Sequence, residues 1–543
     1  MPSGWRRARR TPSFCRRHRG GFAAPRRDHA AARRKLGMLV APAGGVPPPP
    51  ARLVASTRFL PDTIQEPLPM ADAQPLAADQ METTRQEITE RADEVWAGGA
   101  DRTPRVGTLK KHAVKAGSRG RIAIVDGCRT PFVRAGEQFK SMDVIDLASV
   151  PAAEIVRRNE LDPRSIDLSV FGVVVPALIG PNLGREVVLR TPLSDTTVGI
   201  TVNLACASSN RAITTGAEAI LSGQAEIVLA GGAESLSTVP ITFSREASQT
   251  FMKLAKAKSL PAKAKTLAEL RPADLAPNPP AIAEYHTGET MGESCEKMAK
   301  ENSISRRAQD EVALHSHLNA AAAHAAGHFD EQIVATFPHG RRGEAVTHDT
   351  GVRSDTSMEK LAQLRPSFDR GYGTLTAGNS SPLTDGASAV LLMTEERAKA
   401  LGYEPLGYIR SWAYAALDPA TQLLQGPAYA APQALDRAGV TLDDIDLVEM
   451  HEAFAAQILS NMKAFASKKF AEKELGRSKP LGTVDLEKFN VHGGSIAIGH
   501  PFGATGARVT MQLLYELRRR DLGLGLITVC AAGGSGFSMV VER

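Results

Sequence analysis

The chain has 543 residues, a hydrophobic content of 43% and a formal net charge of +6. Its length allows two or more domains with large cores, and its composition is typical of a globular protein. Residues 1–36 carry eleven arginines and one lysine against a single acid, Asp28, so their local charge of +11 leaves −5 for the rest. The folded part therefore gives no reason to expect nucleic acid as a partner. No run of about 18 apolar residues predicts a membrane-spanning helix, so any membrane contact would be peripheral.

Residues 1–118 are predicted to form a disordered, Arg- and Pro-rich extension whose single periodic segment is a helix near Met81 to Trp96. An Arg-rich, acid-poor start resembles a mitochondrial transit peptide, and residues 1–36 would then direct the protein to the mitochondrial matrix. The alternative is an extended reading frame of a GC-rich genome, with the natural start near Met70. We favour this second interpretation, which predicts a bacterial, cytoplasmic protein.

From Arg121 onward, short apolar runs alternate with amphipathic stretches, a pattern typical of βαβ units and a largely parallel sheet. In the first part of this region the expected strands are 121–126, 169–175, 197–205 and 226–230, and the expected helices are 144–159 and 207–222.

The last third of the chain repeats this order of strands and helices. Residues 152–168 parallel residues 431–447, and both segments end in Ile-Asp-Leu, which suggests an internal duplication. The expected strands are 406–413, 445–450, 525–529 and 536–541, and the expected helices are 428–438, 453–466 and 504–520.

Between the two halves, residues 240–365 have a different sequence pattern and are predicted to form an inserted loop domain. The stretch from Lys253 to Arg271 is basic and helix-prone, and several prolines follow it. It is either a solvated helical face or a surface for the phosphates of a nucleotide-bearing ligand, a partner subunit or an anionic membrane.

Cys206 lies where an apolar run gives way to a predicted helix. The N–H groups of a first helical turn stabilise negative charge, so this corner could hold a thiolate. A lone cysteine is more often a small buried hydrophobe. Two glycine-rich motifs at similar junctions, 499–506 and 529–536, add His500 and Cys530. The five cysteines include no Cys-x-x-Cys pair, so neither disulfides nor structural zinc are expected.

The order of these motifs predicts that they converge. In one half the order along the chain is Cys206, a helix, a strand and a glycine pair. In the other half the corresponding order is His500, a helix, a strand and Cys530. If the halves share a fold, the three residues meet across a pseudo-two-fold axis. Ligands of such sheets bind outside the carboxyl ends of the strands, which is where a site is expected.

From about Arg121 to Arg543 the chain resembles the thiolase family. His451 stands where many thiolases carry Asn, and this feature is most similar to the 3-ketoacyl-CoA thiolase β-subunit of the fatty-acid-oxidation trifunctional complex. The shared motifs are residues 129–132, 203–209, 231–237, 291–294, 377–381, 451–455, 499–501 and 530–534.

The resemblance implies a duplicated α/β fold in which two βαβαβαββ halves, 119–398 and 399–543, form five layers (α-β-α-β-α) and the loop domain is an insertion. It also implies an acetyl-CoA C-acyltransferase that cleaves 3-oxoacyl-CoA with CoA in fatty-acid β-oxidation. Coenzyme A is then a substrate, and neither a cofactor nor a metal is expected. A homodimer or higher oligomer and a hydratase/dehydrogenase α-subunit are the implied protein partners.

By the same resemblance, Cys206 accepts the acyl group, His500 takes its proton, and Cys530 handles the proton of acetyl-CoA. The backbone N–H groups of Cys206 and Ala532 form one oxyanion hole, and His500 with a water held by His451 forms the other.

Two further positions are implied to bind substrate: Ser381 meets the pantetheine arm, and Met291 lines the same channel. A short-chain acetoacetyl-CoA thiolase and a non-catalytic acyl-CoA-binding scaffold are the alternatives. A decarboxylating ketosynthase is disfavoured, because its second catalytic position is normally His and here it is Cys530.

Overall fold

The computed structural model describes residues 75, 78–89, 92–95, 107–108, 120–278, 283–339 and 343–543. These residues belong to the second of two compact units, Glu66–Arg543. Most of the extension predicted for residues 1–118, including the Arg-rich start, lies outside the described residues.

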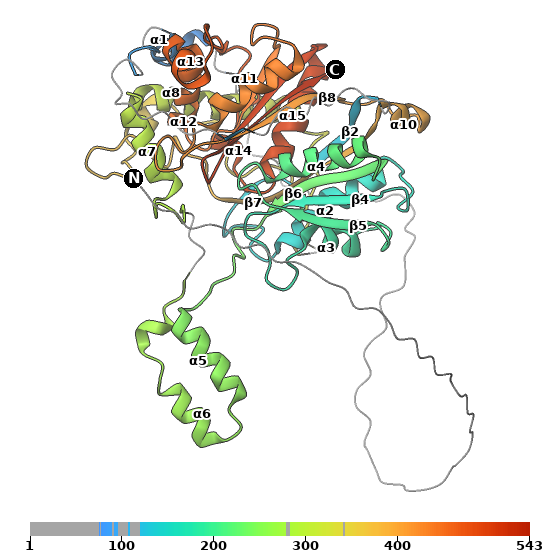
Figure 1. The fold of residues 1–543 in the computed structure, drawn as a ribbon, viewed down its shortest axis with the longest axis vertical. Coiled ribbons are helices and arrows are strands. Elements are labelled where there is room, and N and C mark those ends of the chain that lie inside the picture. Colours follow the sequence, from blue (N-terminus) through green and yellow to red (C-terminus); the bar gives the residue numbers. More distant parts are fainter. Residues whose placement is uncertain are drawn as a thin grey trace, which may run out of the picture. The chain divides into compact units, whose positions relative to one another are not determined.

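The first half contains five principal strands in the order β5-β4-β6-β7-β2 (Figure 1). Strand β4 is parallel to both β5 and β6, whereas β6 with β7 and β7 with β2 are antiparallel. The strands are β2 Ile122–Arg129, β4 Leu168–Gly172, β5 Val198–Val202, β6 Ile227–Glu234 and β7 Thr384–Thr394, with the short β3 Val133–Arg134 beside β7.

The second half repeats this arrangement in the order β9-β10-β11-β8. Beyond β9, Phe489 occupies the place that β5 has in the first half, because it forms a parallel bridge with Val448 of β9. Each half therefore has the strand order 3-2-4-5-1 with the same directions, which confirms the duplication suggested by the sequence. The strands are β8 Gly407–Ala416, β9 Leu447–Met450, β10 Leu524–Ala531 and β11 Ser535–Glu542, and β1 Gly107–Thr108 pairs with β8.

The expectation of a largely parallel sheet is wrong. Among the described strands, only β4 with β5, β4 with β6 and β9 with β10 are parallel. One antiparallel pair follows from a tight turn that joins β10 to β11, because a connection that short can only make an antiparallel pair. The pairs β8 with β11, β2 with β7, β2 with β8 and β6 with β7 are antiparallel between segments distant in sequence. The two halves form one continuous sheet through antiparallel pairing of β2 with β8.

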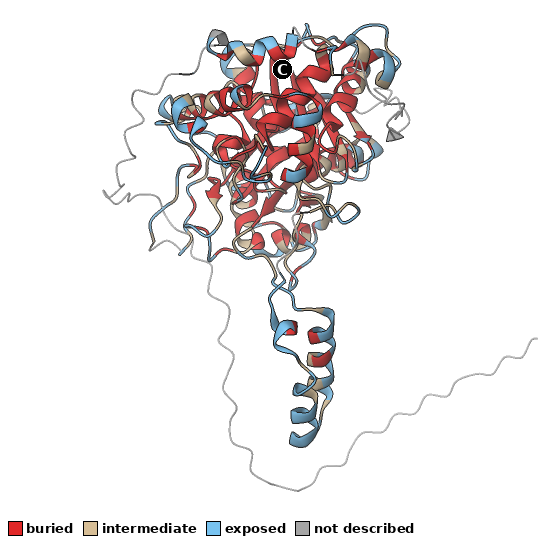
Figure 2. Ribbon diagram, turned by 90° about the vertical axis from the view of Figure 1, so that its left-hand side faces the viewer, coloured by how far each residue is buried: buried red, intermediate tan, exposed pale blue. Residues whose placement is uncertain are grey.

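The helices make the five expected layers with this sheet. One buried cluster packs α2 and α3 against the first half, a second holds α4 and α15 between the halves, and a third packs α11 and α12 against the second half (Figures 1 and 2). Their bounds are α2 Val144–Arg158, α3 Leu183–Arg190, α4 Ser208–Ser222, α11 Gly426–Ala438, α12 Ala455–Ala466 and α15 Thr505–Arg520, with α10 Glu395–Ala400, α13 Lys468–Leu475 and α14 Ser495–Ile498 beside them.

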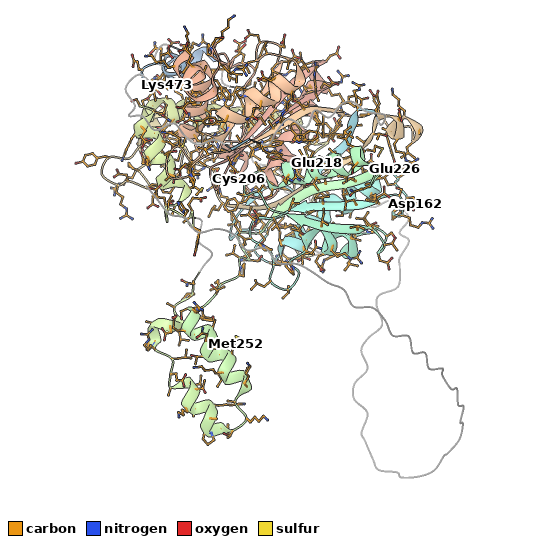
Figure 3. All side chains as sticks on the ribbon, in the orientation of Figure 1. Asp162, Cys206, Glu218, Glu226, Met252 and Lys473 are labelled. Carbon is orange, nitrogen blue, oxygen red and sulfur yellow. The ribbon has the colours of Figure 1, made fainter. Side chains whose placement is uncertain are left out.

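The predicted insertion has two parts. Helices α5 and α6 form an arm whose side chains are mostly exposed, whereas α7 and α8 pack against α12 and α14 (Figure 2). The basic helix-prone stretch lies on the arm, and Met252 marks it in Figure 3. None of the described helices combines the length and apolar composition needed to cross a bilayer. The bounds are α5 Arg245–Lys256, α6 Leu260–Leu267, a 3-10 turn at Pro272–Leu275, α7 Met291–Glu301, α8 Arg306–Ala325 and α9 Met358–Ala362.

The expectation that residues 1–118 contain no packed structure needs a correction, whereas the helix predicted near Met81 to Trp96 is present over part of that range. A 3-10 turn, Ala78–Met81, leads into α1, Glu82–Thr89, which packs against α8 and α12. Met81 and Ile88 are fully buried there, and Thr84 donates to Glu311 on α8. These apolar contacts decide the outcome, because one short helix would not be stable alone in water.

Candidate active site

Cys206 occupies a tight turn between β5 and α4. Ala205 has a φ of 44°, a left-handed conformation that is costly for a residue with a Cβ atom. Ser208 holds the turn by accepting from the Leu204 N–H and donating to the Ala205 carbonyl. The sequence therefore provides a small, hydroxyl-bearing first turn that fixes the thiol at the N-terminus of α4.

The two histidines come from the second half and each has one ring nitrogen anchored. His500 precedes α15, and its Nδ1 lies 2.7 Å from Thr505 Oγ1. His451 follows β9, and its Nδ1 lies 2.8 Å from Ser495 Oγ. Both side chains are buried, and the rings lie 4.1 Å apart between centroids. These hydroxyls fix which ring nitrogen faces the site.

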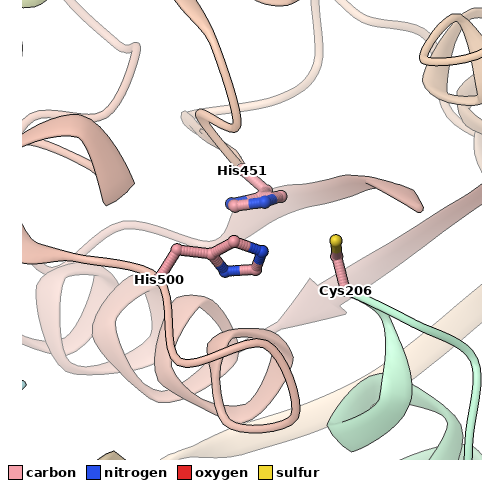
Figure 4. A group of neighbouring side chains, drawn as sticks. All are labelled: Cys206, His451 and His500. Atoms are coloured by element: carbon pink, nitrogen blue, oxygen red, sulfur yellow. The ribbon is translucent and has the colours of Figure 1, made fainter. Parts of the chain in front are cut away.

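Cys206, His451 and His500 converge, as Figure 4 shows. One ligand-type atom of each residue lies within 4.8 Å of those of the other two. The Nε2 atoms of both histidines are buried and have no hydrogen-bond partner within the described part of the chain. Of the residues whose convergence was predicted from the repeated motif order, Cys206 and His500 meet here, and His451, which that prediction did not include, lies with them.

Cys530 lies near the end of β10. It is fully buried, and its charge would interact with that of Cys206. Two residues further on, the Ala532 N–H faces the Cys206 sulfur, as does the N–H of Cys206 itself. Gly533 and Gly534 both have positive φ, the conformation that this tight turn requires. The oxyanion donors predicted at Cys206 and Ala532 therefore point to one place.

Burial opposes the thiolate that the position of Cys206 at a helix N-terminus would favour. Burial raises the pKa of Cys206 to about 12, more than the Ala532 and Cys206 N–H groups lower it. Burial lowers the pKa of His500 to about 3, and it also places the pKa of His451 well below the ordinary value. Charge separation is costly in this enclosed site, so a neutral thiol and neutral imidazoles are the stable forms.

The two predicted substrate-binding residues lie nearby. Ser381 donates its backbone N–H to the carbonyl of Ala453, two residues beyond His451. Met291 begins α7 and packs against the buried cluster that contains Cys530. Their roles toward pantetheine stay predictions.

Several supporting residues were not predicted. Thr505 was visible as a hydroxyl five residues after His500 in the same motif, whereas Ser495 gave no signal because its partner is 44 residues away. Glu234 accepts hydrogen bonds from the backbone N–H groups of Val174, Val175 and Gly503, which ties the two halves together beside the site. Burial raises the pKa of this carboxyl to about 7.

Family models match almost the whole ordered region. The model described as thiolase, N-terminal domain, covers residues 122–396, and the model described as thiolase, C-terminal domain, covers residues 403–543. The chain belongs to the thiolase family. As a thiolase it is an acyltransferase.

Curated relatives and solved structures agree with this membership. The chain is 48% identical over 434 residues to a 3-ketoacyl-CoA thiolase of Vibrio cholerae, covering 80% of this chain and all of the relative. It is 49% identical to a 3-ketoacyl-CoA thiolase of Yersinia enterocolitica, covering 78% and 97%. The Bacillus anthracis acetyl-CoA acetyltransferase and the human mitochondrial 3-ketoacyl-CoA thiolase each have a TM-score of 0.66, with 32% and 30% identity, covering 78% of this thiolase and 99% of each structure.

Proposed function

We propose that this thiolase cleaves 3-oxoacyl-CoA with CoA, releasing acetyl-CoA and a shortened acyl-CoA during fatty-acid β-oxidation. The observation that carries the proposal is the convergence of Cys206, His451 and His500. The 3-ketoacyl-CoA thiolases that are 48–49% identical to this chain support it. Coenzyme A is a substrate in this reaction, and the proposed catalysis uses no cofactor or metal.

In the proposed mechanism, the Cys206 sulfur attacks the carbonyl carbon at position 3 of the substrate, and the thiol proton passes to Nε2 of His500. The N–H groups of Cys206 and Ala532 stabilise the oxyanion of the tetrahedral intermediate. The bond between C2 and C3 then breaks, Cys530 protonates the departing acetyl-CoA carbanion, and the acyl group stays on Cys206 as a thioester. The thiol of CoA attacks this thioester and gives its proton to Cys530, and Cys206 recovers its own proton from His500. Because both the thiol and the imidazole are neutral at rest, the first proton transfer occurs as substrate fills the site.

The test is turnover of 3-oxoacyl-CoA with short, medium and long chains in the presence of CoA. Cys206→Ser should abolish both turnover and labelling of the protein by radioactive acyl-CoA, because serine is a much weaker nucleophile in this site. Cys128→Ser is the matched control, since Cys128 is buried elsewhere against Pro151. Turnover confined to the shortest chain would favour the acetoacetyl-CoA thiolase alternative. Undiminished labelling of Cys206→Ser would reject the assigned nucleophile, and acyl-CoA binding without any turnover would favour the scaffold alternative.

Assembly is also proposed. Strand β5 is an edge strand, and apolar side chains of and near it are exposed: Val198 by 58%, Leu189 by 54% and Ile179 by 90%. Such a patch supports a homodimer or higher oligomer. Light scattering of the native protein and of Val198→Lys checks this, because a buried charge at the patch should shift the mass toward the monomer.

We further propose that an α-subunit with hydratase and dehydrogenase activities binds this protein, as the resemblance to the trifunctional β-subunit implies. The α5–α6 arm supports a peripheral membrane contact, because it exposes Met252 and Leu260 among lysines. Co-purification tests the first point and flotation with anionic vesicles tests the second. The bacterial relatives support a cytoplasmic location.

A further inference from the structure

The proposed reaction assigns Nε2 of His500 to proton transfer, and the family resemblance assigns His451 only a bound water. Two imidazole Nε2 atoms and one thiol face a common point, each within 4.8 Å of the others, and both Nε2 atoms lack a partner among the described residues (Figure 4). Proton transfer from Cys206 requires only one of these imidazoles. A thiol with two imidazoles is also a ligand set typical of zinc.

The hydroxyl contacts of His500 favour metal binding at Nε2. Thr505 donates its O–H to the Pro501 carbonyl, so its Oγ1 accepts the Nδ1–H of His500. This hydrogen bond leaves the lone pair of His500 on Nε2, facing Cys206.

His451 has an equivalent support. Ser495 Oγ accepts from Arg508 Nη2 at 2.8 Å, and its second lone pair can accept the Nδ1–H of His451. Metal-ligating histidines in proteins are oriented by this kind of outer hydrogen bond.

The distances are also close to those of a coordination sphere. Bonds of about 2.0–2.3 Å to a tetrahedral zinc ion place ligand atoms roughly 3.4 Å apart, so side-chain rotations on the order of 1 Å would close the site. Cys206 is partly exposed as a residue, whereas both histidines are buried, so an ion would reach the site from the side of Cys206.

We propose that Cys206, His451 and His500 bind a zinc ion that inhibits the enzyme by occupying the nucleophile. On binding, the S–H bond of Cys206 breaks, a sulfur–zinc bond forms, and the thiol proton leaves to solvent. The two Nε2 lone pairs replace water on the ion, and the fourth position keeps a water molecule. No oxidation or reduction takes place, and acylation of Cys206 is blocked until zinc leaves.

A second cluster in the chain provides a comparison. His328, His492 and Glu516 also bring their ligand atoms within 4.8 Å. However, the Glu516 carboxylate is already occupied by ion pairs with Arg519 and Arg520, so it is not free to bind a metal. This cluster contains no sulfur, so the two sites give different absorption spectra.

The direct test is titration of the full-length protein with Co²⁺, which reports a sulfur ligand through a thiolate-to-cobalt charge-transfer band. The band should saturate at one cobalt ion per chain, and Zn²⁺ should remove it because zinc binds the same ligands more tightly. Cys206→Ser and His451→Asn should lose the band, whereas His328→Ala should keep it. Circular dichroism establishes that each variant is folded.

An activity measurement provides the second test. Zn²⁺ should inhibit turnover while Mg²⁺ at the same concentration does not, and prior acylation of Cys206 should protect. Relative to its own zinc-free rate, His451→Asn should need at least about 10-fold more Zn²⁺ for half inhibition. A band that survives in Cys206→Ser, or one lost in His328→Ala, would overturn the proposal. The proposal would also be overturned if His451→Asn kept the charge-transfer band while Cys530→Ser lost it. The charge-transfer band does not depend on turnover. Its absence would therefore reject the proposed metal site without rejecting the proposed thiolysis.

Discussion

At the scale of single residues, burial determines the chemistry of the site more than the position of Cys206 at a helix N-terminus. The N–H groups at that turn lower the pKa of the thiol, but removal from water raises it further, to about 12. His500 responds in the opposite sense, with a pKa of about 3, because burial disfavours its cationic form. The resting pair is therefore neutral, unlike a preformed thiolate–imidazolium pair.

This assignment predicts the pH dependence of Cys206 alkylation by iodoacetamide. The thiolate fraction should rise tenfold for each pH unit and show no plateau up to pH 10, because the pKa of the thiol lies above that range. Mass spectrometry of the Cys206 peptide measures the rate. A rate that is already constant between pH 6 and 8 would instead indicate a thiolate–imidazolium pair.

The hydrogen bond between Thr505 and His500 predicts that Thr505 orients the imidazole ring. Thr505→Val removes the hydroxyl that accepts from Nδ1, so kcat should fall about 10-fold while KM changes little, because the ring loses its orientation and not its contact with substrate. Thr505→Ser restores the hydroxyl and should recover most of kcat. Equal losses in both variants would mean that packing of the methyl group, and not the hydrogen bond, is responsible.

At the scale of elements, the sequence located most strands and helices of both halves closely, because apolar runs and amphipathic stretches alternate regularly there. It predicted neither strand β7 nor helix α3. The helix expected over 144–159 is α2, Val144–Arg158, and the helix expected over 504–520 is α15, Thr505–Arg520. Helix α1 falls within the helix predicted near Met81 to Trp96, but its docking on α8 and α12 was not predicted, because one short amphipathic segment does not show which distant helices it packs against.

The docking of α1 predicts a stability effect. Ile88→Ala should lower the free energy of unfolding by about 2 kcal/mol, because it removes a fully buried side chain from the cluster that includes α8 and α12. Chemical denaturation measures the change. Gln86→Ala on the exposed face of α1 is the control and should have little effect. Equal stabilities of the two variants would show that α1 does not contribute to the folded core.

At the scale of the whole molecule, the loop domain is joined to the core by a buried ion pair. Arg129, at the end of β2, donates to both oxygens of Asp349 at 2.6 and 2.8 Å, and both side chains are fully buried. The Arg129 guanidinium holds the pKa of Asp349 well below its ordinary value, although burial alone would raise it.

Asp349→Ala should lower the free energy of unfolding by about 3–5 kcal/mol, because it leaves the charge of Arg129 buried without a counterion. Because the pKa of Asp349 is lowered in the folded state, its contribution is present above the carboxyl's unfolded pKa and is lost as the pH falls below it. Denaturation should therefore show that the difference in free energy of unfolding between Asp349→Ala and the parent protein becomes smaller at acid pH. Asp355→Ala, which removes an exposed pair with Lys360, should change stability far less. A similar loss in both variants would contradict this account.

The sequence by itself determined the family, the duplication and the identities of Cys206, His451, His500 and Cys530, because local patterns and motif order are written along the chain. Only the tertiary structure decided that the sheet is mixed, that α1 is docked, and that the resting thiol is protonated. It also showed Ser495 and Thr505 orienting the two imidazoles. Strand direction, burial and the pKa values that burial sets depend on which distant segments pack together, and no local pattern records that.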